Sequence, residues 1–287
     1  MTGCNQCGET RTRPLFSTKG YDLVACSGCG LAYIANPPDA AELARIYSAD
    51  ASYHTALKDP ASKAWADMAG IARQHMAFLA TIAGEGTLLD VGCSTGLFLD
   101  LARTAGFAVK GVEFSEESAG FARDHFGLTV ERGSIHDCTD ADGSYDVLTM
   151  FDVIEHVPDP LADMAAALRL LKPGAWFVLS TPNIDGLFPR ASYPLANALN
   201  YWPHPEPPYH LYQFSVQTLT AMLAKAGFAP GPVRHHAIAL DYTFGSARDL
   251  VRMPKRLAYA LAFAPLAKLG PLIGMGDWFY IAARKPG

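Results

Sequence analysis

The sequence predicts an α/β protein with a doubly wound, mostly parallel sheet, preceded by a small metal-binding module. Two observations predict the sheet: the apolar run 86–91 leads through a glycine loop into a helical pattern from Leu97, and a second strand-to-helix unit covers 108–126. A third observation predicts the module, because two Cys-x-x-Cys pairs stand near the N-terminus. The chain has 287 residues, of which 50% are hydrophobic, so it can bury a substantial core.

The cysteine pairs are the first element along the chain. Eighteen residues separate the inner cysteines of the set Cys4, Cys7, Cys26 and Cys29. Each pair places two thiolates on one side of a tight loop, and the glycine that follows each pair lets the backbone turn back. Four thiolates complete a tetrahedral zinc site with no open position. We therefore expect a zinc ribbon over 1–38 with one structural zinc ion and short strands at 15–17, 21–24 and 31–34.

The region after the ribbon shows a helical pattern over 39–82, which we interpret as a cap or linker over the edge of the sheet. The domain with the sheet then covers 83–287, with insertions at about 186–214 and 245–276. The two remaining cysteines, Cys93 and Cys138, are expected to be small buried residues.

The net charge and the N-terminal residues indicate which partners and which cell compartment to expect. The net charge is −5, whereas proteins that bind nucleic acid usually neutralise several phosphates with Lys and Arg, so we expect no nucleic-acid partner. No basic region followed by an apolar one opens the chain, and paired thiols favour metal binding in a reducing compartment. A cytoplasmic location is therefore expected.

The glycine loop and the acid after it are the candidate ligand site. Asp90 lies near the end of the first strand of the sheet, and Gly92 and Gly96 frame the loop that follows. Glu113 ends the second strand, where a carboxylate can accept hydrogen bonds from both hydroxyls of a ribose. A nicotinamide cofactor favours the spacing G-x-G-x-x-G, which this loop does not have.

These motifs resemble those of the class I S-adenosylmethionine-dependent methyltransferases. Their first motif is an acid, one residue, then Gly-x-Gly-x-Gly, which Asp90, Gly92 and Gly96 match, with Ser94 in place of the middle glycine. Segments 145–160 and 170–180 are similar to the family's fourth-strand motif and to its helix, turn and fifth strand. The resemblance covers about two hundred residues. It implies seven strands, with a sixth at 232–240 and an antiparallel seventh at 277–284.

The resemblance also implies S-adenosylmethionine as cofactor and a role for each matching position. The loop of Asp90, Gly92, Ser94 and Gly96 corresponds to the contact with the methionine part, and Glu113 to the ribose contact. The remaining matches are Ser134 and Ile135 for the adenine, and Phe151 and Asp152 for the surroundings of the sulfonium.

Histidines are the candidate bases. Methyl transfer from a sulfonium needs alignment and desolvation, and a base only when the acceptor is a hydroxyl or an acidic carbon. His210 precedes Leu211 in a His-Leu-x-x-Phe-Ser segment that faces the active-site mouth in related methyltransferases, while His156 follows the fourth strand. A structural hydrogen bond is the alternative for each, and His204 is a weaker candidate.

A magnesium ion is a second option near His156. The spacing of Asp152, Glu155 and His156 is similar to that of quinone O-methyltransferases in which two acids and a histidine bind Mg²⁺. This hard cation needs oxygen-rich company. We keep Mg²⁺ as an unproved option beside acid–base chemistry.

The two insertions each leave two interpretations open. The aromatic side chains of 186–214 either clasp a sugar or an aromatic ring, or pack on the sheet. The segment 245–276 combines basic and large apolar residues, so it either lies on an anionic membrane or forms a cap or dimer surface.

The expected function is methyl transfer to a small molecule, at a hydroxyl or an acidic carbon of a sugar, a natural product or a quinone-like compound. The chain resembles zinc-bearing bacterial methyltransferases of this kind. One alternative is an RNA methyltransferase, which the acidic charge and the lack of an Asn/Asp-Pro-Pro-Tyr motif after the fourth strand oppose. The other is a non-catalytic binding protein that retains the fold.

Overall fold

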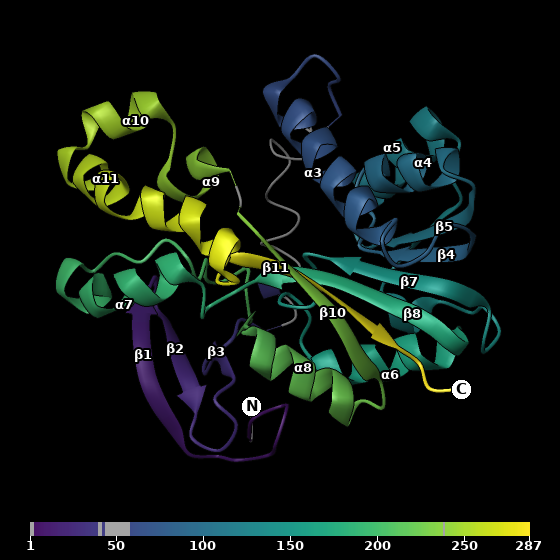
Figure 1. Cartoon of the computed structure of the whole chain (residues 1–287), viewed down its shortest axis with the longest axis horizontal. Helices are drawn as coiled ribbons and strands as arrows, with labels where there is room; N and C mark the ends of the chain where they lie inside the picture. The colour runs from purple at the N-terminus through teal and green to yellow at the C-terminus, as the bar shows by residue number, and fades with distance from the viewer. Residues whose placement is uncertain (1–2, 40–41, 44–57, 238) are drawn as a thin grey trace.

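The computed structural model describes residues 3–39, 42–43, 58–237 and 239–287, and two sheets organise them (Figure 1). The larger sheet has seven strands in the order β10-β11-β8-β7-β4-β5-β6, and the smaller has four in the order β1-β2-β3-β9. Most of the region 40–57, where part of the helical cap was predicted, lies outside the described residues.

The seven-stranded sheet confirms the predicted fold class. Its strands are β4 (Gly86–Val91), β5 (Phe107–Glu113), β6 (Val130–Arg132), β7 (Tyr145–Phe151), β8 (Leu171–Pro182), β10 (Ala229–His236) and β11 (Trp278–Arg284). Neighbours from β6 to β8 pair in parallel, while β11 runs antiparallel to both β8 and β10. The antiparallel last strand agrees with the prediction from the resemblance.

The sixth strand begins and ends earlier than predicted. The expected range 232–240 is wrong at both ends, because β10 covers Ala229–His236 and helix α9 (Leu240–Phe244) begins where the strand was expected to end. The observed strand contains Pro230 and Pro232, which lack a backbone N–H. However, β10 is an edge strand, where a missing backbone N–H is tolerated.

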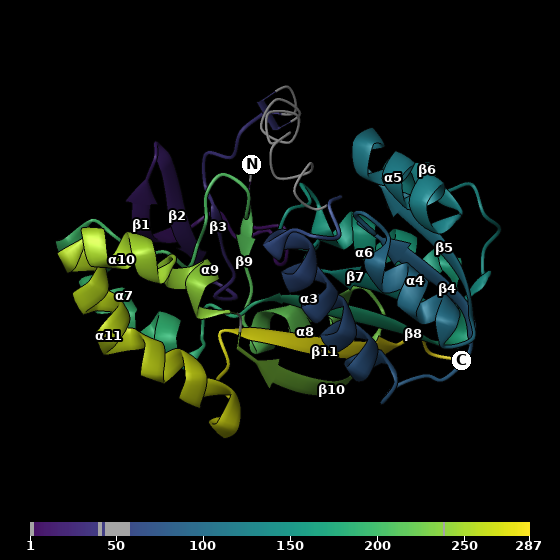
Figure 2. The ribbon, with the colours of Figure 1, turned by 90° about the horizontal axis from the view of Figure 1, so that it is seen from above.

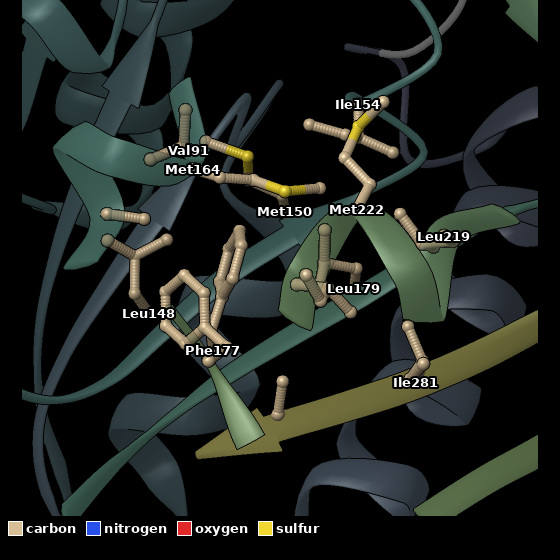
Figure 3. Packing of buried hydrophobic residues seen from close by; sticks show 14 of the residues in the cluster. Val91, Leu148, Met150, Ile154, Met164, Phe177, Leu179, Leu219, Met222 and Ile281 are labelled. Atoms are coloured by element: carbon tan, nitrogen blue, oxygen red, sulfur yellow. The ribbon is translucent and has the colours of Figure 1, made fainter. Parts of the chain in front are cut away.

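Helices cover both faces of this sheet (Figures 1 and 2). One face carries α3 (Lys63–Leu79), α4 (Leu97–Thr104) and α5 (Glu116–Phe126), and the other carries α6 (Pro160–Leu170) and α8 (Val216–Lys225). Figure 3 shows the second interface, in which Leu148, Phe177 and Ile281 of the sheet belong to one cluster with Met164 of α6 and with Leu219 and Met222 of α8. Strands buried on both faces explain the nearly continuous apolar runs in the sequence.

The N-terminal module contains the three predicted strands, β1 (Thr12–Thr18), β2 (Tyr21–Cys26) and β3 (Ala32–Ile34). Its fourth strand, β9 (Tyr212–Gln213), comes from the first insertion and pairs with β3. On the other side of the module, the Asn5 side chain donates to Asp159 Oδ1 at 2.8 Å. The module therefore shares a sheet with the loop that carries His210. The domain boundaries at 38 and 82 stay predictions.

The two insertions stand together beyond the carboxyl edge of the large sheet (Figure 1). The first contains α7 (Leu187–Leu199), and the second contains α10 (Ala247–Arg252), α11 (Pro254–Leu269) and the short helix η2 (Gly270–Ile273), with α9 directly before it. Phe188 of α7 packs with Phe244 of α9 and with Phe263 of α11. By length and composition Pro254–Ile273 could cross a membrane, a test that buried helices of soluble proteins also pass.

Candidate functional site

The loop after β4 is shaped by left-handed backbone conformations. Gly92, Ser94 and Gly96 have φ angles of 77°, 50° and 84°. A Cβ atom at Gly92 would lie 2.4 Å from Val153 Cγ2, and one at Gly96 would lie 2.7 Å from Leu128 Cδ1. Glycine is thus required at both positions for conformation and for space. The contact with Val153 also brings the loop against the chain that follows β7.

Ser94 occupies the left-handed position where the resembling motif has glycine, which leads to a prediction. Ser94→Gly should raise the free energy of unfolding by about 0.5 to 1 kcal/mol, because a Cβ atom in this conformation costs about 1 kcal/mol or more. Urea unfolding of the two proteins measures the difference. Ser94→Ala is the matched control, since it removes the hydroxyl but keeps the strained backbone, and it should bring no gain. A glycine variant less stable than the wild type would contradict this interpretation.

Glu113 is held at the end of β5 by two backbone donors. Its Oε2 accepts a hydrogen bond from Ser94 N–H and its Oε1 from Ser115 N–H, each at 2.8 Å. Ser115 also caps α5, so the carboxylate bridges the loop after β4 and the start of this helix. The position is suited to a ligand at the carboxyl edge, and the predicted ribose contact stays a prediction.

Asp90, Ser134 and Ile135 lie near the same edge with partners inside the protein. Asp90 is buried and accepts a hydrogen bond from Thr149 Oγ1 at 2.6 Å, and burial raises the pKa of Asp90 to about 7. Ser134 bonds with Asp137 at the start of a short helical turn, η1 (Ile135–Asp137), while the Ile135 side chain is buried in the core. Their cofactor roles stay predictions.

Asp152 follows β7 in a left-handed conformation, with φ of 55°. Its Oδ1 accepts hydrogen bonds from Ser180 Oγ at 2.7 Å and from Trp278 Nε1 at 2.8 Å. Neither partner was identified from the sequence. The antiparallel direction of the last strand is the signal that could have indicated Trp278, because the first residue of such a strand lies at the carboxyl edge of its neighbours.

Aromatic and imidazole rings surround Phe151, next to Asp152. His75 of α3 stacks on Phe151 with ring centroids 4.1 Å apart, and its Nδ1 lies 2.9 Å from the Tyr280 hydroxyl. His236 stacks on the other ring partner, Tyr280, at 4.5 Å. Burial lowers the pKa of His75 to about 3 and that of His236 to about 4, so both are neutral near pH 7. This wall can take an uncharged flat group.

Glu155, His156 and His210 form what we call the acid–base cluster, with one ligand-type atom of each within 4.8 Å of the others. His156 Nδ1 donates to the Tyr209 carbonyl at 2.9 Å, which leaves its Nε2 as an acceptor in the neutral ring. Glu155 Oε2 accepts from Thr181 Oγ1 at 3.0 Å. The loop 200–211 thus brings His210 next to His156. This contact between the two candidate bases could not be predicted from the sequence.

His210 is the least satisfied member of the cluster. Its side chain is buried, and Nδ1 has no hydrogen-bond partner among the described residues. Its Nε2 lies 3.8 Å from Glu206 Oε2, which favours the proton on that nitrogen and leaves Nδ1 as an acceptor. Burial, with the neighbouring His156, lowers the pKa of His210 well below its usual range, so the ring is neutral near pH 7. A buried acceptor without a partner can accept a hydrogen bond from a ligand hydroxyl group.

The cluster does not present the donors expected for Mg²⁺. The predicted set was Asp152, Glu155 and His156, but Asp152 is bonded to Ser180 and Trp278 and stands outside the group. Two of the three donors within reach are imidazole nitrogens, whereas Mg²⁺ prefers oxygen. These residues therefore fit acid–base chemistry better than a magnesium centre.

Most aromatic residues of the first insertion pack inside the protein. Trp202 lies edge-on to Phe16 of the ribbon at 6.0 Å, and Phe188 and Tyr212 are also buried. His204 is buried beside Trp202, which favours a structural role over the weaker prediction of a base. Tyr209, at the mouth of the cluster, is exposed. Packing is thus the main use of these rings.

Two hollows lie away from the acid–base cluster and from the glycine loop. One of about 330 Å³ is at the amino ends of the strands, beside Asp146 and Lys172. The other, of about 240 Å³, lies between the ribbon and α7, beside Arg13 and Trp202. Size alone therefore does not mark the site, and we locate it by the chemistry of the carboxyl edge.

The four predicted zinc ligands converge at the tip of the ribbon. Cys4 Sγ lies 3.5 Å from Cys29 Sγ, and Cys7 Sγ lies 3.5 Å from Cys26 Sγ. All four sulfur atoms are within 4.8 Å of one another, a spacing that suits four thiolates about 2.3 Å from one zinc ion. The glycines after the two pairs have φ angles of 77° and 80°, as the predicted knuckles require.

Comparison with known proteins identifies a methyltransferase domain. A family model described as a methyltransferase domain matches residues 64–230, more than half of the chain. A ubiquinone biosynthesis O-methyltransferase of Thiobacillus denitrificans is 38% identical over 110 residues, which are 36% of this chain and 47% of that protein. The chain thus spans about half the length of the curated relatives it matches.

Solved structures support the fold alone. A possible histamine N-methyltransferase of Thermotoga maritima has a TM-score of 0.54 and 19% identity, over 85% of this chain and 97% of that one. The cyclase SpnF has a TM-score of 0.58 and 16% identity, over 87% and 98%. Proteins described as a methyltransferase and as a cyclase thus share this architecture, so the chemistry has to be argued from the site.

Proposed function

Because the chain belongs to the class I S-adenosylmethionine-dependent methyltransferase family, we propose that it methylates a hydroxyl group of a small molecule, with His210 as the general base. The observation that carries this proposal is the buried His210 Nδ1, which has no partner among the described residues. Further support comes from the relatives named ubiquinone biosynthesis O-methyltransferase, which match about a third of the chain.

The carboxyl edge of the sheet supplies the binding groups. S-adenosylmethionine, when bound, supplies a methyl group that is already activated for displacement. Glu113 holds the ribose, the loop from Gly92 to Gly96 approaches the methionine part, and Phe151 closes the pocket at the end of β7. The wall of His75 and Phe151 excludes water and takes the uncharged body of the acceptor.

The acid–base cluster then handles the proton. The acceptor hydroxyl would donate a hydrogen bond to His210 Nδ1, and this nitrogen would take the proton as the new oxygen–carbon bond forms and the sulfur–carbon bond of the methyl donor breaks, leaving a neutral thioether. His156, whose ring centroid is 4.8 Å from that of His210, positions the base from one side, and Glu206 attracts the proton on Nε2 from the other. We propose that the protein resides in the cytosol. In that reducing compartment the four clustered thiols stay reduced and can bind a metal, instead of forming disulfides.

The experiment is a transfer assay with methyl-labelled S-adenosylmethionine. We expect label on phenols or alcohols and none on matched compounds in which hydrogen replaces the hydroxyl. Glu113→Ala serves as the cofactor control and should weaken cofactor binding by about 1 to 3 kcal/mol, measured by calorimetry. Normal cofactor binding without transfer to any hydroxyl, or transfer only to amines, would overturn the proposal.

A further inference from the structure

The segment from α10 through η2 exposes an unusual number of large apolar side chains. Six such residues are exposed there: Val251, Met253, Leu261, Leu269, Leu272 and Ile273. The exposed fractions of Leu261 and Leu272 reach 70% and 80%. Large apolar side chains exposed together in one segment are typical of an interaction surface, whereas single exposed ones are ordinary.

Helix α11 is apolar on both of its sides. Tyr259, Phe263 and Ala267, spaced by four residues, are buried against α7 and α9. Leu261 and Leu269 face away from this contact and are exposed. A helix with apolar side chains on two sides is normally covered on both of them. Only 28% of the apolar window in Pro254–Ile273 is buried within the chain, so one side is left for another surface.

The charge of the segment indicates what covers that side. Residues 247–276 contain five basic residues, Arg248, Arg252, Lys255, Arg256 and Lys268, and one acidic residue, Asp249. A symmetric dimer through this face would bring two such positive segments together, at a cost from like-charge repulsion. An anionic bilayer offers both an apolar interior and negative headgroups.

The topology excludes a single crossing of the membrane. The segment leaves the sheet at His236 and returns at Trp278, and these two residues are paired across β10 and β11. The five steps from Ile273 to Trp278 span at most about 18 Å, less than the bilayer core of about 30 Å. Because α11 also packs against α7, a bilayer that meets this helix would contact it along its exposed side.

We infer that α10, α11 and η2 dock the protein on an anionic membrane surface, with the exposed leucines in the outer acyl region and the basic residues at the headgroups. Both views show α10 and α11 at the periphery of the molecule, where a flat surface can reach them (Figures 1 and 2). This partner is the lipid surface itself, independent of any reaction.

Helix α9, which directly precedes the docked segment, is linked to the acid–base cluster through Glu206. The hydroxyl of Tyr242, on α9, donates to Glu206 Oε2 at 3.0 Å, and the same carboxylate oxygen lies 3.8 Å from His210 Nε2. An acceptor dissolved in the bilayer would thus enter beside α9. This consequence for the acceptor rests on the proposed function, whereas docking itself does not.

Co-sedimentation tests the docking without any turnover. The full-length protein is mixed at low salt with vesicles of phosphatidylcholine alone or with one third phosphatidylglycerol. We expect it to pellet with the anionic vesicles and to be released by high salt. Lys255→Gln with Lys268→Gln should weaken binding about fivefold for each charge removed. The charge-matched control, Arg73→Gln with Arg132→Gln, changes exposed residues elsewhere and should bind as the wild type does.

Leu261→Asn with Leu272→Asn tests the apolar part and should weaken binding at least tenfold. Both residues are exposed, so the variant keeps its fold, which circular dichroism checks. Failure of the wild type to pellet at low salt, or equal pelleting of all variants, overturns the inference. A wild-type dimer in gel filtration that the leucine variant abolishes also overturns it in favour of self-association. Since no methyl transfer is measured, these outcomes are distinct from failure of the proposed function.

Discussion

His210→Ala should lower kcat by about 10²- to 10⁴-fold and leave the affinity for S-adenosylmethionine unchanged. General base catalysis contributes a factor of this size, and His210 is not among the residues that we assign to the cofactor. Steady-state kinetics with a hydroxyl acceptor and calorimetry with the cofactor separate the two effects. His210→Asn is a second variant that keeps a polar group in the buried site, and it should be similarly slow.

The control for this change is His125→Asn, an exposed histidine at the far end of α5, which should keep full activity. The pH dependence gives an independent check. A base must be neutral to act, and burial lowers the pKa of His210, so the acidic limb of kcat/KM should lie well below pH 6.5. Retained activity in both His210 variants would exclude the base. Activity that depends on added Mg²⁺ would instead favour a metal at the cluster.

Cys29→Ser should abolish the binding of one zinc ion per chain and strongly destabilise the ribbon. Structural zinc contributes about 10 to 16 kcal/mol of binding free energy in zinc-finger peptides, and so small a module cannot compensate by its core. A loss of a few kcal/mol should lower Tm by roughly 10 °C. Metal analysis and thermal unfolding measure the two effects.

The consequence should extend to catalysis, because β3 of the ribbon pairs with β9, two residues after His210. Ile34 N–H donates to the Leu211 carbonyl at 2.9 Å, next to the base. We therefore expect kcat to fall more than cofactor affinity. Cys138→Ser is the matched control: its thiol bonds to Asp140 at 3.1 Å outside the cluster, and the variant should keep its zinc. Purified wild type without zinc would contradict the assignment.

Motifs that span only a few residues were sufficient for much of the prediction from the sequence. The sequence contains, in close succession, a strand, the glycine loop around Gly92, a helix and the acid Glu113. The backbone conformation of the loop favours glycine, so the loop can be found from the sequence. The cysteine pairs are equally local, since each knuckle is a single tight turn. The four ligands could therefore be predicted from their spacing, and the sulfur positions agree.

Contacts between distant segments were beyond such signals. Trp278 donates a hydrogen bond to Asp152, which lies 126 residues earlier in the sequence. His75 stacks on Phe151 from α3, the helix that precedes the glycine loop in the sequence. Both contacts arise where strand ends and a covering helix meet. Periodicity identifies a buried face, but it does not say which other face covers it.

For this protein, the order of its residues was sufficient to predict the class of fold, the direction of the last strand and the convergence of the four cysteines, because backbone geometry and family motifs act over short spans. Three further features required the folded chain: the pairing of His156 with His210, the shared sheet between ribbon and insertion, and the exposure of Leu261 and its neighbours on an apolar helix. Each depends on how a loop or helix packs against elements far away in the sequence. The same local pattern is compatible with several such packings, and the total burial of apolar surface selects among them.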